Sequence, residues 1–301
     1  MKKLLFTLKN IFKLSNLGTI IFFILNMVVL FGIFSMFSEG EPVNIWALLS
    51  IYALSLLLAF SRPGQKVMCF FNGARKMVRH DMRDRVMPVV EEVYRAAKKK
   101  TPQLPDRIYV RIMHESEPNA FAIGTNTICV TEGMLSMPEN LMAGVIAHEM
   151  GHLAMQHTVI QLLIGGGNLI ITGIILLASA LQAMLSAGTV ASGAAAGTSR
   201  SSTGCLIGSI CALFCAMLTG IIWLWTQICS LLLMGSSRAN EYAADRYAHE
   251  IGYGDELAEA LDRLTLGAPR STILQLLYNS HPEPSDRIGR LHGMGSTYSR
   301  F

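Results

Sequence analysis

The stretch Val145–Ile164, VIAHEMGHLAMQHTVIQLLI, joins the two kinds of sequence from which this chain is built. Its second half opens an apolar block, residues 158–237, in which Arg200 is the one charged residue, and an earlier block, residues 15–61, carries two charges. The 174 residues outside these blocks hold 43 of the 46 charged residues, about the quarter that is typical of a soluble domain. The composition therefore excludes a disordered chain and an ordinary soluble enzyme. It predicts a soluble domain interleaved with two membrane blocks.

Four segments of the two blocks are apolar enough to cross a bilayer. We expect spans at about 17–37 and 43–60 in the first block, and at about 158–185 and 205–234 in the second. At 1.5 Å per residue, such segments match a hydrocarbon core of about 30 Å. The intervening residues 186–204, rich in Gly, Ala, Ser and Thr, are expected to form a loop. The alternative for the first span is a cleaved signal peptide, but the apolar run is too long and no small-residue cleavage site follows it.

The basic residues around these spans predict the orientation of the chain. Lysine and arginine concentrate before the first span and after the second, whereas the loop between those two spans has neither. Since cytoplasmic loops carry the excess of Lys and Arg, we expect a multi-pass protein of the cytoplasmic (inner) membrane with both termini and both soluble segments on the cytoplasmic side. No basic helix with interleaved aromatic residues occurs, so no nucleic-acid partner is expected.

The soluble segments, residues 62–157 and 238–301, are together long enough for one hydrophobic core. Asp81–Lys100 has apolar residues along one side of a predicted helix, and Arg107–Ile112 and Thr127–Thr131 have the composition of short strands. The pattern predicts a domain that contains both helices and a sheet.

A further helix is expected to begin near Ser136. Ser136 fits the N-cap, Pro138 the first turn, and Glu139 the acidic position of a capping box. The helix that starts there contains the sequence HEMGH, residues 148–152.

The HEMGH sequence predicts a metal site. On a helix His148 and His152 lie one turn apart on one face, so that both imidazoles can bind one metal ion. Glu149 lies beside them, where it can take a proton from water that the metal activates. The plain alternative is two ordinary histidines on a helix.

A second motif, EYAAD at residues 241–245, strengthens the metal interpretation. A catalytic zinc needs a third protein ligand. Glu241 and Asp245 share one helical face, so that one carboxylate can bind the metal while the other accepts a hydrogen bond from a ligand histidine. A solvated helical face is the alternative for this pair alone, but the pair and HEMGH flank the same predicted membrane hairpin.

The two motifs together resemble those of the gluzincin peptidases of family M48, in particular the HtpX-type membrane proteases. HEMGH matches the HExxH motif of that family and EYAAD its ExxxD motif. The segment PNAFA, residues 118–122, resembles the family's edge strand, and Ser280-His281-Pro282 followed by Arg287-Ile288 resembles its C-terminal segment. Four spans, with a hairpin inserted between the two motifs, also fit.

The resemblance implies a role for each candidate site residue. His148, His152 and Glu241 would bind one Zn²⁺ ion per chain, and Glu149 would act as the general base. The other implied roles are orientation of a zinc-binding histidine by Asp245, contact with the substrate backbone by Asn119, stabilisation of the oxyanion by His281, and support of the site by Arg238.

Simpler interpretations remain open for some of these residues. Asn119 fits a turn after Pro118, His281 fits a structural contact, and Arg238 fits an anchor at the membrane surface. At His157 the HtpX-type relatives often carry Asp, while other members of the wider family carry His. We interpret His157 as a helix-end residue at the membrane surface and not as a ligand, because it lies five positions after His152 rather than three or four.

The predicted fold is a mainly α-helical integral membrane protein of about four transmembrane helices with a cytoplasmic α+β metalloprotease domain of gluzincin type. Residues 1–61 form the first membrane hairpin, 62–157 the first part of the catalytic domain, 158–237 the second hairpin and 238–301 the second part of the domain. Straight helices would place the zinc roughly 6–9 Å from the second apolar block.

The predicted activity is hydrolysis of peptide bonds in membrane or misfolded proteins at the cytoplasmic face, in proteolytic quality control. The substrate would add as a strand beside residues 119–131. Two alternatives are a processing peptidase with one dedicated substrate and a catalytically inactive, metal-binding membrane scaffold.

Overall fold

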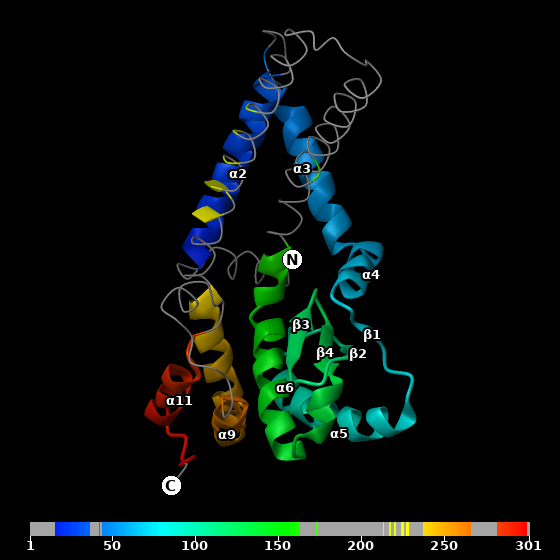
Figure 1. Ribbon diagram of the computed structural model, residues 1–301, viewed down its shortest axis with the longest axis vertical. Helices are drawn as coiled ribbons and strands as arrows, with labels where there is room; N and C mark the ends of the chain where they lie inside the picture. The colour runs from blue at the N-terminus through cyan, green and yellow to red at the C-terminus, as the bar shows by residue number, and fades with distance from the viewer. Residues whose placement is uncertain are drawn as a thin grey trace, which may run out of the picture.

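The computed structural model describes residues 16–36, 42, 44–162, 237–265 and 282–299, with a few single positions between 173 and 228. The predicted spans at 158–185 and 205–234, and the loop between them, fall almost entirely outside these residues. The described part of the chain is mainly helical with one small sheet (Figure 1). The predicted mixture of helices and sheet is therefore confirmed, whereas the number of spans and the domain boundaries stay predictions.

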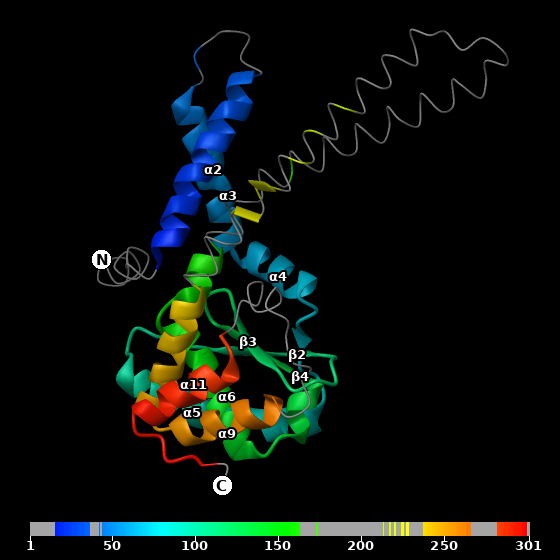
Figure 2. The same ribbon diagram turned by 60° about the vertical axis from the view of Figure 1, so that its left-hand side comes forward.

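Two long helices, α2 (Leu17–Met36) and α3 (Ile45–Phe60), converge at one end and extend away from the sheet (Figures 1 and 2). They pack on each other through Leu30 and Leu48, while many of their large apolar side chains are exposed. Among the described residues, no single helix combines the length and the apolar character of a membrane span. Helix α3 and the helix that follows it would reach that length together, across a bend of 68°.

The bend separates α3 from α4 (Arg62–Phe71) at Ser61. The hydroxyl of Ser61 caps α4 by accepting a hydrogen bond of 3.1 Å from the backbone N–H of Gly64. A Cβ atom at Gly64 would lie 2.0 Å from the carbonyl oxygen of Leu58, so the sharp turn requires glycine there. Since α4 then contacts strand β3 (Ala120–Ile123), the turn directs the chain from the apolar helices to the sheet.

The sheet has the strand order β1-β2-β4-β3. Strand β1 (Arg75–Lys76) pairs antiparallel with β2 (Tyr109–Met113), β2 pairs parallel with β4 (Thr127–Thr131), and β4 pairs antiparallel with β3. The two predicted strands are confirmed, with β2 shifted by two residues at its start. Among the described strands β3 lies at the edge of the sheet, as the resemblance of PNAFA to an edge strand implied.

Helix α6 (Glu139–Ala154) occupies the centre of the described residues that surround the sheet. Figure 1 shows it between the sheet on one side and the helices α9 (Gly254–Thr265) and α11 (Pro284–Gly293) on the other. Helix α5 (His80–Lys100) packs against α6 through the predicted apolar face. The buried residues of α5 are Met82, Val86, Val89, Val90, Val93 and Ala97. Almost every side chain of α6 is buried, so its histidines are held inside the core.

The predicted capping box at Ser136 is wrong. Ser136 ends a short 3₁₀ helix, Glu132–Ser136, and its hydroxyl donates a hydrogen bond of 2.7 Å to the carbonyl of Gly133. Helix α6 begins two residues later than the box requires, and no side chain caps it. Ser136 lies within the 3₁₀ turn, where its hydroxyl bonds locally to Gly133, and Pro138 occupies the N-cap position of α6 instead.

Two glycines of α6 set how closely neighbouring helices approach it. A Cβ atom at Gly151 would lie 3.0 Å from the Cα of Ala244, in the helix described over residues 237–250. A Cβ atom at Gly144 would lie 2.5 Å from the backbone nitrogen of Leu257 in α9. Gly151 therefore lets the helix of the EYAAD motif lie directly on the helix of the HEMGH motif, and Gly144 allows the close approach of α9.

Candidate metal centre

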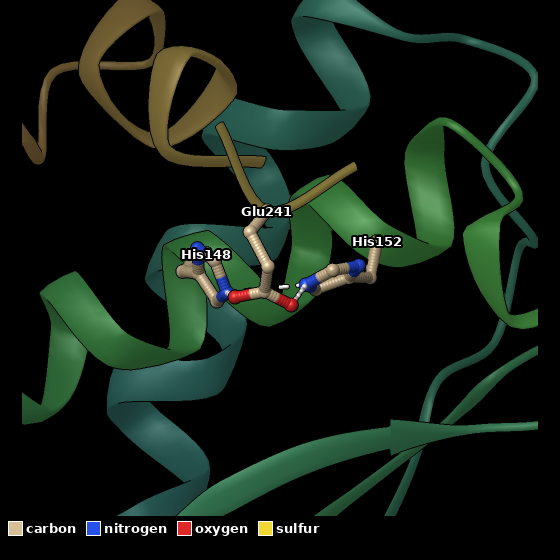
Figure 3. Close-up of side chains that lie close together, drawn as sticks. All are labelled: His148, His152 and Glu241. Atoms are coloured by element: carbon tan, nitrogen blue, oxygen red, sulfur yellow. Dashed lines mark hydrogen bonds and ion pairs between the residues drawn. The ribbon is translucent and has the colours of Figure 1, made fainter. Parts of the chain in front are cut away.

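Three side chains from the two motifs converge at the contact between the helices. His148 and His152 come from α6, and Glu241 comes from the helix over residues 237–250. Figure 3 shows the Glu241 carboxylate between the two imidazole rings. The Nε2 atoms of the histidines are 3.1 Å apart, and the Glu241 oxygens lie 3.4 Å from His148 Nε2 and 3.3 Å from His152 Nε2. All three side chains are buried.

These distances fit a tetrahedral zinc ion. Zinc binds imidazole nitrogen and carboxylate oxygen at about 2.0–2.2 Å, so tetrahedral ligand atoms lie about 3.3–3.5 Å from one another. One nitrogen from each histidine and one Glu241 oxygen lie within 4.8 Å of one another, and the shortest histidine–Glu241 distances, which the two different oxygens of Glu241 make, are close to this spacing. Two nitrogens and one oxygen are also the donor types of catalytic zinc sites that leave a fourth position open. His148, His152 and Glu241 could therefore hold the metal.

The far side of the His148 ring is held by Asp245. Asp245 Oδ1 lies 2.8 Å from His148 Nδ1, which leaves Nε2 pointing at Glu241 and His152. Burial raises the pKa of the Asp245 carboxyl, but hydrogen bonds from Arg287 and His148 outweigh burial and hold this pKa below its ordinary value. Asp245 is therefore a carboxylate that accepts from His148 and fixes which ring nitrogen faces the other two ligands.

Arg287 of α11 completes this arrangement. Its Nε donates to Asp245 Oδ2 at 2.8 Å and its Nη2 to Oδ1 at 2.6 Å, and its Nη1 lies 3.6 Å from Glu241. Burial lowers the pKa of Arg287, but the contact with Asp245 raises it more, so this buried guanidinium stays charged. The sequence indicated Arg287 only as part of a C-terminal segment, and no role was predicted for it. No helical spacing connects it to Asp245, which is 42 residues away.

The charges around His148 favour its protonated form when no cation is present. Burial and the nearby Arg287 lower the pKa of His148, but hydrogen bonds to Asp245 and Glu241 raise it more, to about 9. Since a metal ligand must be the neutral imidazole, a metal ion competes with a proton for this ring. The site is therefore built to attract a cation.

The predicted general base, Glu149, lies between the cluster and the sheet. Its Oε2 accepts a hydrogen bond of 2.7 Å from the backbone N–H of Ala122 in β3. Its Oε1 lies 3.9 Å from His148 Nε2. One oxygen is therefore fixed by the edge strand, and the other lies on the side of His148 Nε2.

A cavity of about 1010 Å³ opens over these residues. Strand β3 and the residues around it form one wall, Met68 of α4 and Asn72 directly after that helix also line the cavity, and the three ligands and Glu149 lie among the lining residues. Val145, Leu257, Leu261 and Leu264 add an apolar wall. The cavity therefore joins the cluster to an edge strand that can pair with an extended chain.

The remaining predicted residues are placed as follows. Asn119 is exposed, lies directly before β3 and lines the cavity, while its backbone carbonyl accepts from Thr131 N at 2.9 Å. Arg238 is half-buried at the described start of the helix that carries Glu241. His281 lies outside the described residues.

His157 differs from the prediction. It is buried, and its Nδ1 lies 3.1 Å from Nδ1 of His152. The prediction of a helix-end residue at the membrane surface assumed an unbroken helix. In the structure α6 ends at Ala154, and Gln156 has a φ of 62° before helical structure resumes at His157. This turn brings His157 to the side of His152 that faces away from the other ligands.

Comparison with known proteins supplies an independent finding. Residues 82–294 match the family model of peptidase family M48. The chain is 31% identical to the protease HtpX homolog of Campylobacter curvus over 214 residues, which are 62% of this chain and 68% of that protein. It is 31% identical to the protease HtpX homolog of Burkholderia thailandensis over 219 residues, which are 64% of this chain and 68% of that protein.

Among solved structures, the chain is similar to S. mikatae Ste24p, with a TM-score of 0.48 and 19% identity. The similarity covers 88% of this chain, which spans 62% of the length of that structure.

Proposed function

This chain belongs to peptidase family M48 and is a metalloprotease, and we propose that it is a zinc endopeptidase embedded in the cytoplasmic membrane, which cleaves membrane or misfolded proteins at the cytoplasmic face. The observation that carries the proposal is the buried cluster of His148, His152 and Glu241 with Glu149 beside it, at a cavity bordered by an edge strand. A role in proteolytic quality control is part of the proposal and rests on the resemblance of the motifs to those of the HtpX-type proteases.

The chemistry follows from the positions of the side chains. When bound, Zn²⁺ supplies Lewis acidity, which polarises the scissile carbonyl and acidifies water. Glu149 Oε1 accepts the proton of the attacking water and passes it to the leaving amine. The Ala122 N–H holds Oε2 during both transfers, so the carboxylate does not turn away from the site. Asp245 and Arg287 keep His148 in the orientation that presents Nε2.

The substrate backbone would pair with β3. Alternate residues of an edge strand direct their N–H and C=O groups away from the sheet, and the N–H of Ala122 is directed to Glu149 and not to β4. The groups of Ala120 then face outward in the same register, and Asn119 lies directly before them on the cavity wall. An extended peptide added to this edge passes beside Glu149.

The apolar wall of the cavity supports a preference for apolar side chains. Val145 and Leu257 line the cavity together with the ligands, and Leu261 and Leu264 extend this wall. An apolar side chain next to the scissile bond would be buried there, with a gain of about 25 cal/mol per Å² of apolar surface removed from water. Segments of membrane proteins and unfolded chains supply such side chains.

The membrane location is supported by the apolar surface of α2 and α3. Trp46 and Leu57 are 79% and 68% exposed, and Ile24, Val28, Phe31 and Leu54 are exposed as well. An apolar surface of this extent is expected to meet lipid or another protein. The basic residues that follow α3, from Arg62 to Arg79, support a cytoplasmic position for the cavity.

The proposal is tested with the full chain in detergent micelles. The protein is purified with a chelator, reloaded with Zn²⁺ and mixed with casein. We expect cleavage by the wild type and at least about a 100-fold loss in Glu149→Gln, because a general base contributes about 10²–10⁴-fold. If the folded, zinc-loaded wild type is as inert as the variant, the chain is a metal-binding scaffold and the proposal fails.

The preference for substrates near the bilayer has its own test. A folded soluble domain without the apolar blocks is compared with the full chain in proteoliposomes, using one membrane protein and one soluble protein as substrates. We expect the full chain to cleave the membrane protein faster than the soluble domain does. Equal cleavage of both substrates by both forms would contradict this part of the proposal.

A further inference from the structure

The chain leaves helix α6 by an uncommon backbone conformation. Gln156 has a φ of 62°, which lies in the left-handed region that residues other than glycine rarely adopt. The N–H of Gln156 donates to the carbonyl of Leu153, and its own carbonyl accepts from Val159 N, so the turn is closed on both sides. In an unbroken helix, residues 152 and 157 would point about 140° apart. The turn instead places both imidazoles in one buried contact.

The contact joins two ring nitrogens, so that one of them must donate the hydrogen and the other must accept it. The Nδ1 atoms of His152 and His157 are 3.1 Å apart, and the rings meet edge to face with their centroids 5.1 Å apart. Two neutral imidazoles make this hydrogen bond only if one Nδ1 carries a hydrogen and the other does not. A His152 ring that binds zinc through Nε2 keeps its hydrogen on Nδ1. His157 must then accept at Nδ1.

We propose that His157 is a positioning residue that accepts the Nδ1–H of His152 and holds its Nε2 toward the zinc position. It does for His152 what Asp245, at 2.8 Å, does for His148. The inference rests on the proposed zinc site. Because His157 is followed directly by the second apolar block, the same hydrogen bond connects the zinc site to the start of the predicted hairpin.

Three substitutions separate the hydrogen bond from packing. His157→Asn keeps an acceptor oxygen near the position of the imidazole Nδ1, His157→Gln moves it toward the position of Nε2, and His157→Phe keeps the ring without an acceptor. Zinc affinity is measured on the full chain in micelles by competition with a chromophoric chelator. The melting temperature of each metal-free variant reports its folding separately.

We expect His157→Phe and His157→Gln to lose about 10–100-fold in zinc affinity, as is common when the hydrogen-bond partner of a ligand histidine is removed. His157→Asn should stay within about threefold of the wild type, well inside that loss. If His157→Phe does not fold, the comparison of His157→Gln with His157→Asn decides in the same way.

Wild-type affinity in a folded His157→Phe or His157→Gln variant would overturn the inference. An equal loss in all folded variants would also overturn it, because the side chain would then act by size alone. A wild-type chain that binds no zinc would instead refute the proposed function, so the two failures are distinguishable.

Discussion

Replacement of Arg287 tests how the metal centre is held together. The guanidinium meets both oxygens of Asp245, at 2.6 and 2.8 Å, and both side chains are buried. In Arg287→Met the side chain keeps much of its volume, but the Asp245 carboxylate stays buried with His148 beside it. Removing one partner of a buried ion pair costs about 3–5 kcal/mol when a charge is left uncompensated, and in the metal-free chain the protonated His148 can compensate only one of the two carboxylates, Asp245 and Glu241, that Arg287 contacts. We expect the free energy of unfolding to fall by about this amount.

The assay is thermal unfolding of the metal-free full chain in micelles. For a domain of 150–250 residues, 1 kcal/mol corresponds to about 2–4 °C, so the melting temperature should fall by about 6–20 °C. The matched control is the double variant Arg287→Met with Asp245→Asn, in which no charge is stranded. It should recover most of the melting temperature. Its zinc affinity should stay low, because an amide is a weaker acceptor for His148 than a carboxylate.

Two results would refute this reasoning. The first is a single variant Arg287→Met that melts within about 2 °C of the wild type, which corresponds to less than about 1 kcal/mol. The second is a double variant that is as unstable as the single one, because the cost would then come from lost packing and not from the stranded charge of Asp245.

Two further predictions concern the frame around the site. Gly144→Ala should lower the free energy of unfolding by about 1–3 kcal/mol, because the new Cβ would lie 2.5 Å from the backbone of Leu257. Gly289→Ala should raise it by up to about 1 kcal/mol, because a Cβ at this helical position would have no neighbour within 4 Å. Chemical denaturation measures both changes. Hydrogen bonds from Ser296 and Thr297 lower the pKa of Asp255 to about 2, so docking of the C-terminal segment on α9 should be complete above pH of about 4 and be lost as the pH falls toward 2. Asp255→Asn should loosen that segment at neutral pH, which hydrogen exchange of the Thr297 amide detects; unchanged exchange in the variant would contradict the assignment.

Periodicity and composition of the sequence correctly predicted several of the helices and strands. The buried face of α5, the strands β2 and β4 and the helix that carries HEMGH all follow from periodicity and composition. The same helical spacing predicted that His148 and His152 share one face, and the structure places them 3.1 Å apart.

What the sequence did not predict depends on tertiary packing or on a single backbone angle. Arg287 reaches Asp245 because α11 packs against the core, and no spacing rule connects residues 42 positions apart. His157 reaches His152 because Gln156 adopts a positive φ, which glycine would have signalled and glutamine does not. The capping box failed because Ser136 belongs to the preceding 3₁₀ turn, where its hydroxyl bonds to Gly133, and α6 begins only at Glu139. In each case the structure was determined by a contact or a backbone angle that the local pattern does not contain.

We infer that HEMGH and EYAAD form one zinc site. It is tested most directly by anomalous diffraction at the zinc absorption edge, from crystals of the full-length Glu149→Gln variant loaded with Zn²⁺. We expect one strong peak per chain within about 2.0–2.2 Å of His148 Nε2, His152 Nε2 and one Glu241 oxygen. A peak bound by other residues, or a folded chain loaded with zinc but without a peak at this position, would contradict it.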